Sequence, residues 1–153
     1  MDIIKAESPP QIEASRALFR EYERFLAVDL CFQDFEQELA TLPGKYAPPE
    51  GALFLAVEGQ QAMGCVAVRK LAAGICEMKR LYVRPAYHRK GLGRLLAVRV
   101  IEEAKSLGYH KMRLDTLARL TEAMRLYESL GFRRIPAYYE NPLPQVVYWE
   151  LTF

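Results

Sequence analysis

The sequence predicts a single α/β domain of the α+β kind, in which a mixed, mainly antiparallel sheet carries helices on both faces. Three short apolar runs follow one another between residues 52 and 83, separated only by turns at Glu58-Gly59 and Ala73-Gly74. Such short gaps are typical of an antiparallel meander. Two longer runs, at 11–27 and 92–107, have the apolar spacing of helices. A strand–helix–strand order in the second half adds a parallel component and therefore predicts a mixed sheet.

The elements are predicted in the order β-α-α-β-β-β-α-β-α-β-β. Ser8 precedes the first helix as an N-cap, and the two prolines after it are tolerated at a helix start. Gly108 and Gly131 are suitable helix stops, because glycine accepts the left-handed conformation that often follows a helix. In chain order, the predicted ranges are 2–6, 11–27, 34–42, 52–58, 62–71, 75–83, 92–107, 109–117, 121–131, 132–135 and 146–153.

The strand predicted at 75–83 does not alternate cleanly between apolar and polar residues. Its apolar residues fall on one parity before Lys79-Arg80 and on both parities after it. A β-bulge that shifts the register at this point explains the break. The central strand of the sheet is therefore expected to be bulged.

The composition is that of one globular domain spanning residues 1–153. Apolar residues make up 51% of the chain and charged residues 26%, and the formal net charge is +2. So small a charge does not require a nucleic acid or an anionic membrane as a partner, and we expect neither. The start "MDIIKAES" lacks a secretory pattern, and no apolar run reaches the ~20 residues that cross a bilayer, so we expect a cytoplasmic protein.

The cysteines and histidines predict neither a disulfide nor a metal site. The three cysteines are widely spaced, and Cys65 and Cys76 fall in apolar, strand-like runs, where we expect buried, reduced thiols. His88 and His110 are the only histidines, and neither belongs to a cluster of metal-ligating residues. We therefore expect no metal.

The stretch "YHRKGLGR", residues 87–94, lies between a predicted strand and a predicted helix. A helix N-terminus offers unpaired N–H groups and a partial positive charge, and Gly91 and Gly93 let the backbone approach a ligand. Arg89, Lys90 and Arg94 add charge-assisted hydrogen bonds to phosphate oxygens. On these residues alone, a cradle for an anion and a solvated basic turn remain equally open.

The residues around this stretch resemble a known family. The segment "EMKRLYVRPAYHRKGLGRLLAVRVIEEA" is similar to the acyl-CoA-binding segment of the GNAT N-acetyltransferase superfamily, and "AMRLYESLGF" resembles that family's second signature. The two stand in the family's order and on the expected elements, and the whole predicted element order agrees with a GNAT-like sheet. One position departs from the pattern: His88 stands where the family has Gln or Arg.

The resemblance implies acetyl-CoA as co-substrate and a site for it. Backbone groups of the bulged strand would pair with the pantetheine arm, and the amides of the glycine loop would hold the pyrophosphate. Tyr127, the tyrosine of the second signature, would stand near the CoA sulfur and protonate the leaving thiolate. The implied cofactor residues are Leu81, Tyr82, Val83, His88, Arg89, Lys90, Gly91, Leu92, Gly93, Arg94 and Tyr127.

Glu77 and Tyr127 are the predicted catalytic residues. Glu77 lies where several GNAT relatives carry a general base, and a carboxylate in the apolar run "ICEM" is expected to have a raised pKa and to accept the amine's proton. The competing interpretation is a solvent-facing carboxylate paired with Lys79 or Arg69. Asp115 is the rival base, although at its strand end it is expected to fix loop geometry. For Tyr127, the competing interpretation is an ordinary core aromatic.

The acceptor side is less defined by the sequence. The resemblance implies that the first two helices and the loop before the last strand shape it, so Tyr138, Tyr139 and Asn141 are the predicted acceptor-binding residues. The competing interpretation is a loop stiffened by prolines, with tyrosines packed on the surface. The expected acceptor is a small-molecule amine or a protein amine.

The leading hypothesis is an acetyl-CoA-dependent N-acetyltransferase in which the amine attacks directly within a ternary complex, since no cysteine has a histidine near it in sequence. A backbone N–H near Leu81 is the expected oxyanion donor. The first alternative is a catalytically silent acyl-CoA sensor that regulates a partner protein. The second is a nucleic-acid-binding module, which the low net charge disfavours. A homodimer is left open.

Overall fold

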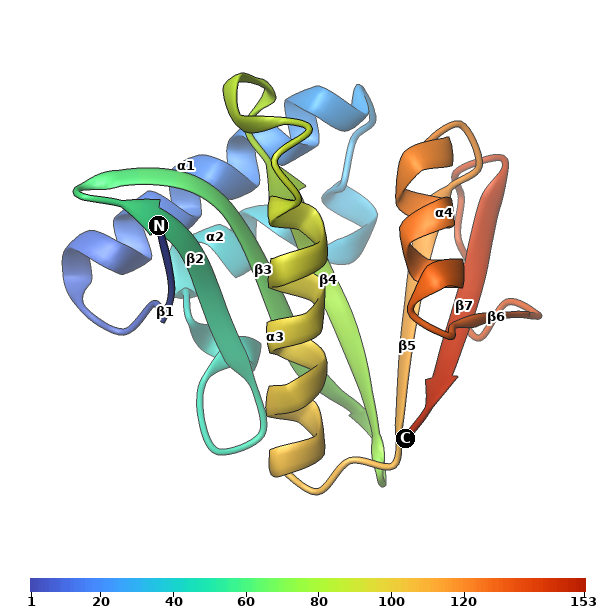
Figure 1. The fold of residues 1–153 in the computed structure, drawn as a ribbon. Coiled ribbons are helices and arrows are strands. Elements are labelled where there is room, and N and C mark those ends of the chain that lie inside the picture. The colour runs from blue at the N-terminus through green and yellow to red at the C-terminus, as the bar shows by residue number, and fades with distance from the viewer.

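The computed structural model describes residues 1–153 and places a seven-stranded sheet between two groups of helices (Figure 1). The eleven helices and strands follow in the predicted order. Short 3₁₀ turns at Cys31–Gln33, Gly44–Tyr46 and Pro85–Tyr87 connect some of them. In chain order the elements are β1 (Asp2–Lys5), α1 (Pro9–Leu26), α2 (Phe35–Thr41), β2 (Ala52–Glu58), β3 (Gln61–Ala72), β4 (Ile75–Val83), α3 (Leu92–Ser106), β5 (Lys111–Leu117), α4 (Thr121–Ser129), β6 (Arg133–Ile135) and β7 (Val146–Thr152).

The strand order is β1-β2-β3-β4-β5-β7-β6, which confirms the predicted mixed, mainly antiparallel sheet. The pair β4–β5 is parallel and the other neighbours are antiparallel. This parallel ladder joins only Ile75–Glu77 to Lys111–Arg113. Beyond it the two strands diverge (Figure 1), so the second half of β4 has an edge with no strand partner.

The predicted bulge lies in β4. Tyr82 pairs with Cys65 of β3 and Lys79 pairs with Ala67, so the residues between them form two positions opposite one. Arg80 absorbs the irregularity with φ of 60°. On β3, a Cβ at Gly64 would stand 2.6 Å from the Tyr82 carbonyl oxygen. Glycine is therefore required where β3 approaches the end of β4 so closely.

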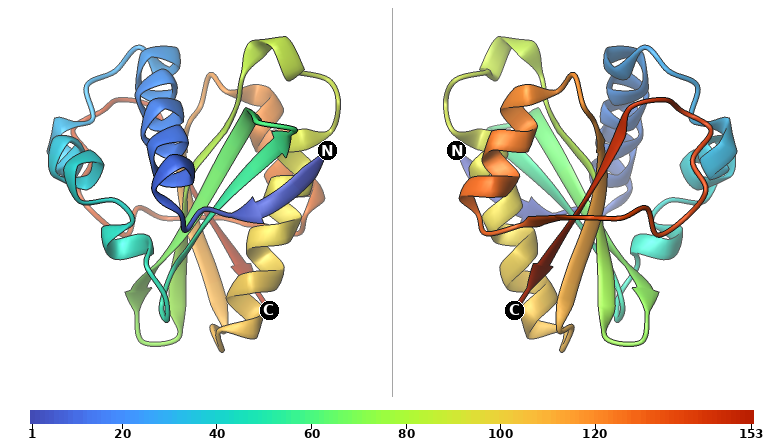
Figure 2. Two further views of the ribbon diagram at one scale, coloured as in Figure 1. Left: turned by 90° about the vertical axis from the view of Figure 1, so that its left-hand side faces the viewer. Right: turned by 90° about the vertical axis from the view of Figure 1, so that its right-hand side faces the viewer.

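The helices cover both faces of the sheet, with α1 and α2 on one side and α3 and α4 on the other (Figure 2). Helix α1 begins at Pro9, two residues earlier than predicted, because Ser8 and Gln11 form a capping box: the Ser8 Oγ accepts from the Gln11 N–H and the Gln11 Oε1 accepts from the Ser8 N–H. None of the helices combines the length and apolarity that a membrane span requires.

Each face of the sheet has its own apolar core, because successive side chains of a strand point to opposite faces. Under α1 and α2, Phe19, Phe35 and Leu55 are buried together. Under α3 and α4, Phe54 and Leu96 belong to the second cluster. Cys65 and Cys76 are free and buried, one in each core, as predicted.

Candidate active site

The opening between β4 and β5 forms a cavity of about 520 Å³, here called the cofactor cavity. It runs along the unpaired edge of β4, past the loop before α3, to the first turn of α4. Most of the residues that the sequence assigned to the cofactor lie in its wall: Leu81, Tyr82, Val83, His88, Arg89, Gly91, Leu92, Gly93 and Tyr127. The structure thus brings together two signatures that lie more than twenty residues apart in the chain.

The loop before α3 lines this cavity with Gly91 and Gly93. Gly91 is the N-cap of α3 with φ of 74°, and no side chain accepts a hydrogen bond from the first turn. A Cβ at Gly93 would find only the Leu126 Cδ2, at 3.9 Å. The helix start is therefore uncapped and unobstructed, which is the arrangement that binds an anion.

Two basic residues of the loop do not line the cofactor cavity. Arg94 Nη1 donates to Ser129 Oγ at 2.9 Å and so ties α3 to α4. Lys90 Nζ lies 5.7 Å from the centroid of the Tyr87 ring. Their predicted contacts with phosphate stay predictions, and Arg89 is the basic residue of the loop that lines the cavity.

His88, whose role the sequence left open, anchors the loop to the end of β4. Its Nε2 lies 2.8 Å from the Val83 carbonyl oxygen. Because a carbonyl can only accept, the Nε2 nitrogen carries the proton and donates it. In this chain, His88 therefore holds the loop against the end of β4 through this hydrogen bond.

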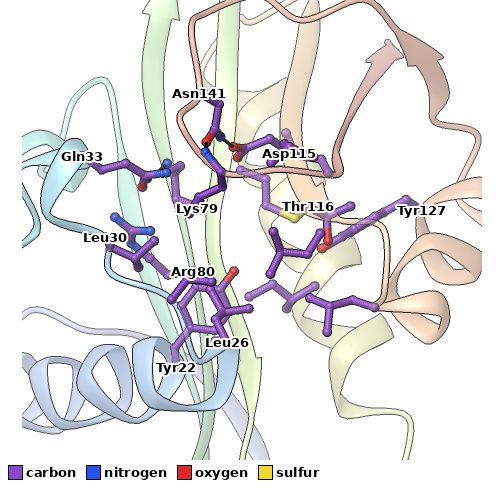
Figure 3. A pocket seen from close by; sticks show the side chains of 18 residues that line it. Tyr22, Leu26, Leu30, Gln33, Lys79, Arg80, Asp115, Thr116, Tyr127 and Asn141 are labelled. Carbon is purple, nitrogen blue, oxygen red and sulfur yellow. Dashed lines mark hydrogen bonds between the residues drawn. The ribbon is translucent and has the colours of Figure 1, made fainter.

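A smaller cavity of about 50 Å³, here called the acceptor cavity, adjoins the first one (Figure 3). Leu81, Asp115 and Tyr127 line both cavities. Of these two cavities, Lys79 and Asn141 line only the acceptor cavity. Figure 3 shows Lys79, Asn141 and Asp115 gathered at one end of it, with Tyr127 on another side. The two cavities therefore share part of their wall.

Tyr127 is 6% exposed and combines the two interpretations that the sequence offered. Its ring packs against Phe132 and Trp149, with centroids 5.7 Å and 6.5 Å away, as a core aromatic does. It also forms part of the wall of both cavities. Burial raises the pKa of its hydroxyl far above the usual value, so the group keeps its proton at any physiological pH.

Asp115 lies on β5 and holds the loop that precedes β7. Its Oδ2 accepts from the Tyr139 hydroxyl and from Asn141 Nδ2, the latter at 3.3 Å. Asn141 Nδ2 also donates to the Tyr139 oxygen at 2.8 Å. These neutral donors leave the carboxylate without a cationic partner within 4.0 Å.

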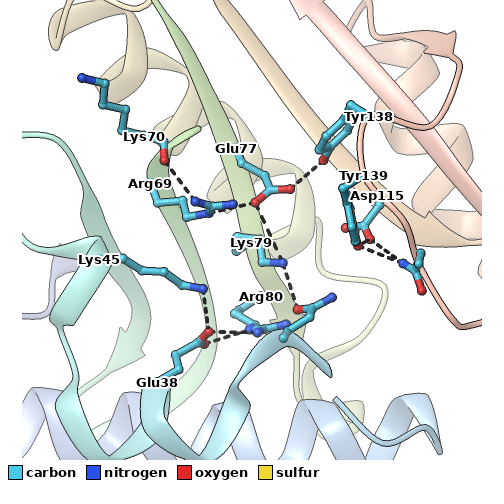
Figure 4. A network of polar contacts seen from close by, with 12 residues as sticks. Glu38, Lys45, Arg69, Lys70, Glu77, Lys79, Arg80, Asp115, Tyr138 and Tyr139 are labelled. Atoms are coloured by element: carbon cyan, nitrogen blue, oxygen red, sulfur yellow. Dashed lines mark hydrogen bonds and ion pairs between the residues drawn. The ribbon is translucent and has the colours of Figure 1, made fainter. Parts of the chain in front are cut away.

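Glu77 is buried in a polar network rather than in the apolar setting that its sequence context suggested (Figure 4). Arg69 Nε donates to its Oε1 at 2.9 Å, and the Tyr138 hydroxyl donates to its Oε2 at 2.6 Å. Burial alone would raise the pKa of Glu77, but Lys79, Tyr138 and Arg69 outweigh it and the pKa lies below its usual value. The expectation of a raised pKa was therefore wrong, because the partners come from other strands and loops.

Glu77 also does not line the cofactor or acceptor cavity. It lies in the wall of a third cavity of about 290 Å³, together with Tyr138 and Tyr139. Glu77 is 1% exposed, so it does not face solvent as the competing interpretation required, although it does pair with both residues which that interpretation named, Arg69 at 2.9 Å and Lys79 at 4.0 Å. Lys79 lines both this third cavity and the acceptor cavity.

Lys79 and Arg80, which break the strand pattern in the sequence, are both buried charges. Arg80 donates two hydrogen bonds to the carboxylate of Glu38, both at 2.9 Å. Lys45 is a second partner of that carboxylate, at 3.1 Å. Lys79 Nζ donates to Gln33 Oε1 at 2.9 Å. Burial, followed by the neighbouring Arg80, lowers the pKa of Lys79 to about 8.

Helix α1 contributes Tyr22 and Phe25 to the cavity wall, and both belong to the apolar run that predicted this helix. Tyr22 and Phe25 line the cofactor cavity and pack their rings 6.0 Å and 5.9 Å from that of Tyr82. Phe25 remains 45% exposed. The helical spacing in the sequence could not distinguish an aromatic of the core from one that lines an open cavity.

The chain matches the family model described as "Acetyltransferase (GNAT) family" over residues 13–132. A Schizosaccharomyces pombe protein named an uncharacterized N-acetyltransferase is 43% identical over 153 residues, which cover 99% of this chain and 94% of that protein. The crystal structure of an acetyltransferase from Streptococcus agalactiae has a TM-score of 0.82 at 20% identity, covering 99% of this chain and 98% of the other. A GNAT family acetyltransferase from Elizabethkingia anophelis, solved with acetyl-CoA bound, has a TM-score of 0.60 at 24% identity, covering 73% of this chain and 82% of that one.

These similarities agree with the geometry of the two cavities. The family model spans both signatures and the whole wall between β4 and α4. The predicted fold and the predicted N-acetyltransferase activity are confirmed. The chain belongs to the acetyltransferase (GNAT) family.

Proposed function

We propose that this enzyme transfers the acetyl group of acetyl-CoA to an amine by direct attack within a ternary complex. The observation that carries the proposal is the wall shared by the cofactor cavity and the acceptor cavity, in which Asp115 and Tyr127 both lie. Two substrates that enter from the two cavities meet beside an acid and a base. Holding both reactants at one point supplies much of the rate enhancement of such a transfer.

The residues of the cofactor cavity fit acetyl-CoA. The unpaired edge of β4 offers backbone groups at Leu81 and Val83 to the pantetheine amides, as an added strand would use them. The uncapped start of α3 at Gly91 offers N–H groups to the pyrophosphate. The Leu81 N–H, next to the bulge, is the proposed donor to the oxyanion that forms on the thioester carbonyl.

Tyr127 is the proposed general acid. Its hydroxyl is protonated and lies in the wall that both substrates touch. When the amine nitrogen forms its bond to the acetyl carbon and the C–S bond breaks, this hydroxyl donates a proton to the departing thiolate.

Asp115 is better placed than Glu77 to take the proton from the amine. Asp115 lines both cavities, whereas Glu77 lines only the third one and has both oxygens engaged by Arg69 and Tyr138. The prediction that Glu77 is the base stays a prediction. Its buried position favours a role in holding Tyr138 and the charge of Lys79, and substitution of each carboxylate decides between the two.

The cysteines favour direct attack over an acyl-enzyme. Burial raises the pKa of the Cys65 thiol far above its usual value and that of Cys76 to about 12. Cys31 is exposed, and its hydrogen bond with Asp29 raises its thiol pKa. None of the three lines the cofactor or the acceptor cavity, and thiols that keep their protons are poor nucleophiles.

Thermal shift with acetyl-CoA, followed by thiol release across a panel of amines, tests the proposal. We expect stabilisation by acetyl-CoA and by CoA at low and at ~200 mM salt, since salt screens the backbone donors of the site less than it screens exposed charges. Turnover of at least one amine, with release of free CoA, is the expected second result. Stabilisation without any turnover would instead support the silent sensor, and no stabilisation would remove the cofactor site.

A further inference from the structure

Lys79 is a buried ammonium group whose charge has no partner at hydrogen-bonding distance. It is 8% exposed, and its Nζ has one hydrogen bond, to the neutral amide of Gln33. The nearest carboxylate oxygen, Glu77 Oε1, is 4.0 Å away and already bonded to Arg69. An ammonium group has three donors, and here one is bonded to Gln33 while the ion pair with Glu77 is too long for a hydrogen bond, so two donors lack an acceptor.

The other charges of this network are paired, which isolates Lys79 further. Arg80 and Lys45 both bind Glu38, and Arg69 binds Glu77. Two carboxylates therefore face four cations, and Lys79, at the wall of the acceptor cavity, has the longest of these ion pairs, 4.0 Å to Glu77. The network supplies a positive charge to this cavity.

Asp115 supplies a negative charge to the same cavity. It accepts hydrogen bonds from Tyr139 and Asn141, which are both neutral, and it forms no ion pair within 4.0 Å. Asp115 also reaches the cofactor cavity, whereas Lys79 does not. The acceptor cavity thus has a cation on the β4 wall and an anion on the β5 wall, and the anion lies on the side of the thioester.

We propose that the acceptor is a free α-amino acid, whose carboxylate is bound by Lys79 and whose amine lies beside Asp115. This assignment rests on the proposed acetyl transfer and names its substrate class. An α-amino acid carries both charges on one carbon, so a single small molecule satisfies both walls at once. A carboxylate between Lys79 Nζ and the amide of Gln33 fills the free donors. The same ammonium repels simple amines and polyamines, which bring no carboxylate to neutralise it.

The test compares each of the twenty common L-amino acids with its own α-amide. The two differ in the carboxylate alone, and the amide has the lower amine pKa and would be the more reactive nucleophile without carboxylate recognition. We expect the best amino acid to have a kcat/KM at least tenfold above that of its amide. If the amides are used as well as the acids, or better, the assignment is overturned.

Lys79→Met links the preference to the ammonium group, because methionine keeps much of the length and loses the charge. We expect the acid-to-amide ratio to fall to about one, with acetyl-CoA binding kept within about twofold. Lys70→Met is the matched control, since Lys70 is 49% exposed and pairs with Glu50 away from the cavity. A ratio kept in Lys79→Met, or lost equally in Lys70→Met, contradicts the role of Lys79.

Binding to the CoA-loaded protein separates this inference from the proposed transfer. If acetyl-CoA binds but no amine causes release of CoA, the proposed acetyl transfer is refuted. Calorimetry can then still compare the binding affinity of each amino acid with that of its amide, which tests the recognition of the carboxylate. The inference is supported if an amino acid binds to the wild-type protein, while its amide does not bind and the amino acid does not bind to Lys79→Met. If none of the twenty amino acids binds the CoA-loaded wild-type protein or is acetylated, the assignment is wrong.

Discussion

The two sides of the active site are built from different materials. The cofactor side depends on backbone geometry at three places: the open edge of β4, the bulge at Arg80 and the uncapped start of α3 at Gly91. The acceptor side consists of side-chain charges, with Lys79 and Asp115 facing one cavity. A backbone site needs a particular chain geometry, whereas a charged site needs particular partners, and substitutions should affect the two sides in different ways.

The largest effect is expected from Asp115→Asn. Loss of a positioned general base lowers kcat by roughly 10²–10⁴-fold, while acetyl-CoA binding should change little because the backbone donors remain. Thiol-release kinetics and calorimetry measure the two quantities. Glu77→Gln is the matched comparison. A larger fall in kcat with Glu77→Gln than with Asp115→Asn would restore Glu77 as the base.

Tyr127→Phe is expected to rank second, with kcat lowered on the order of 10²-fold through loss of the general acid. The ring and its contacts with Phe132 and Trp149 are kept, so the melting temperature should stay within a few degrees of wild type. An unchanged kcat at every pH would leave Tyr127 as a core aromatic alone.

Gly64→Ala tests the backbone side through packing. The new Cβ would meet the Tyr82 carbonyl oxygen at 2.6 Å, and overpacking of this kind costs about 1–3 kcal/mol of unfolding free energy. Displacement of the β4 end should also weaken acetyl-CoA binding. Gly59→Ala is the control, because its φ of 60° strains an alanine although nothing lies within 4 Å. Equal weakening of acetyl-CoA binding by both variants would argue against a role of the β4 edge.

The pH dependence of product binding sharpens the acceptor side. An N-acetyl amino acid has no titratable amine, so its inhibition constant reports the charge of Lys79. Because the pKa of Lys79 is about 8, the constant should be flat below that pH and rise up to about tenfold per pH unit above it. Lys79→Met should give a weak and flat profile, and a wild-type profile that stays flat to pH 9.5 would contradict the assignment. The charged and polar groups around Lys79 are Arg80, Glu77, Asp115, Lys45 and Gln33.

The smallest effect is expected from Arg94→Gln. Arg94 donates to Ser129 and does not line the cofactor cavity. If backbone amides hold the pyrophosphate, acetyl-CoA affinity should fall less than about tenfold, which is 1.4 kcal/mol, with a slightly weaker dependence on salt. A loss of a hundredfold or more in calorimetry would show that the side chain, and not the backbone, dominates on this side.

The difference between the two sides also explains what the sequence could predict. The bulge was visible because Lys79-Arg80 breaks the strand parity, and the loop at Gly91 was visible because a backbone site depends on a short run of consecutive residues. Element order followed from local periodicity and turns. All of these signals lie within a few residues of the feature that they describe.

The charges of the acceptor side could not be predicted in this way. Glu77 receives its hydrogen bonds from Arg69, opposite it on β3, and from Tyr138, which is 61 residues later. The apolar neighbours of Glu77 in sequence suggested a raised pKa, but its neighbours in space lower it. Lys79 likewise meets Gln33 from 46 residues earlier. Only the fold determines which charges remain without a partner.

The short ladder between β4 and β5 divides the sheet into two parts, which are joined by only three residue pairs. The apolar cluster that contains Leu96 and Trp149 includes residues of both parts of the sheet. Side-chain packing, more than backbone hydrogen bonds, therefore holds the two parts together. A ligand that lies along the unpaired edge of β4 would act as an extra strand and add hydrogen bonds to the backbone there. Slower amide exchange at Leu81 and Val83 in the loaded protein would record a sheet that is complete only while the enzyme is at work.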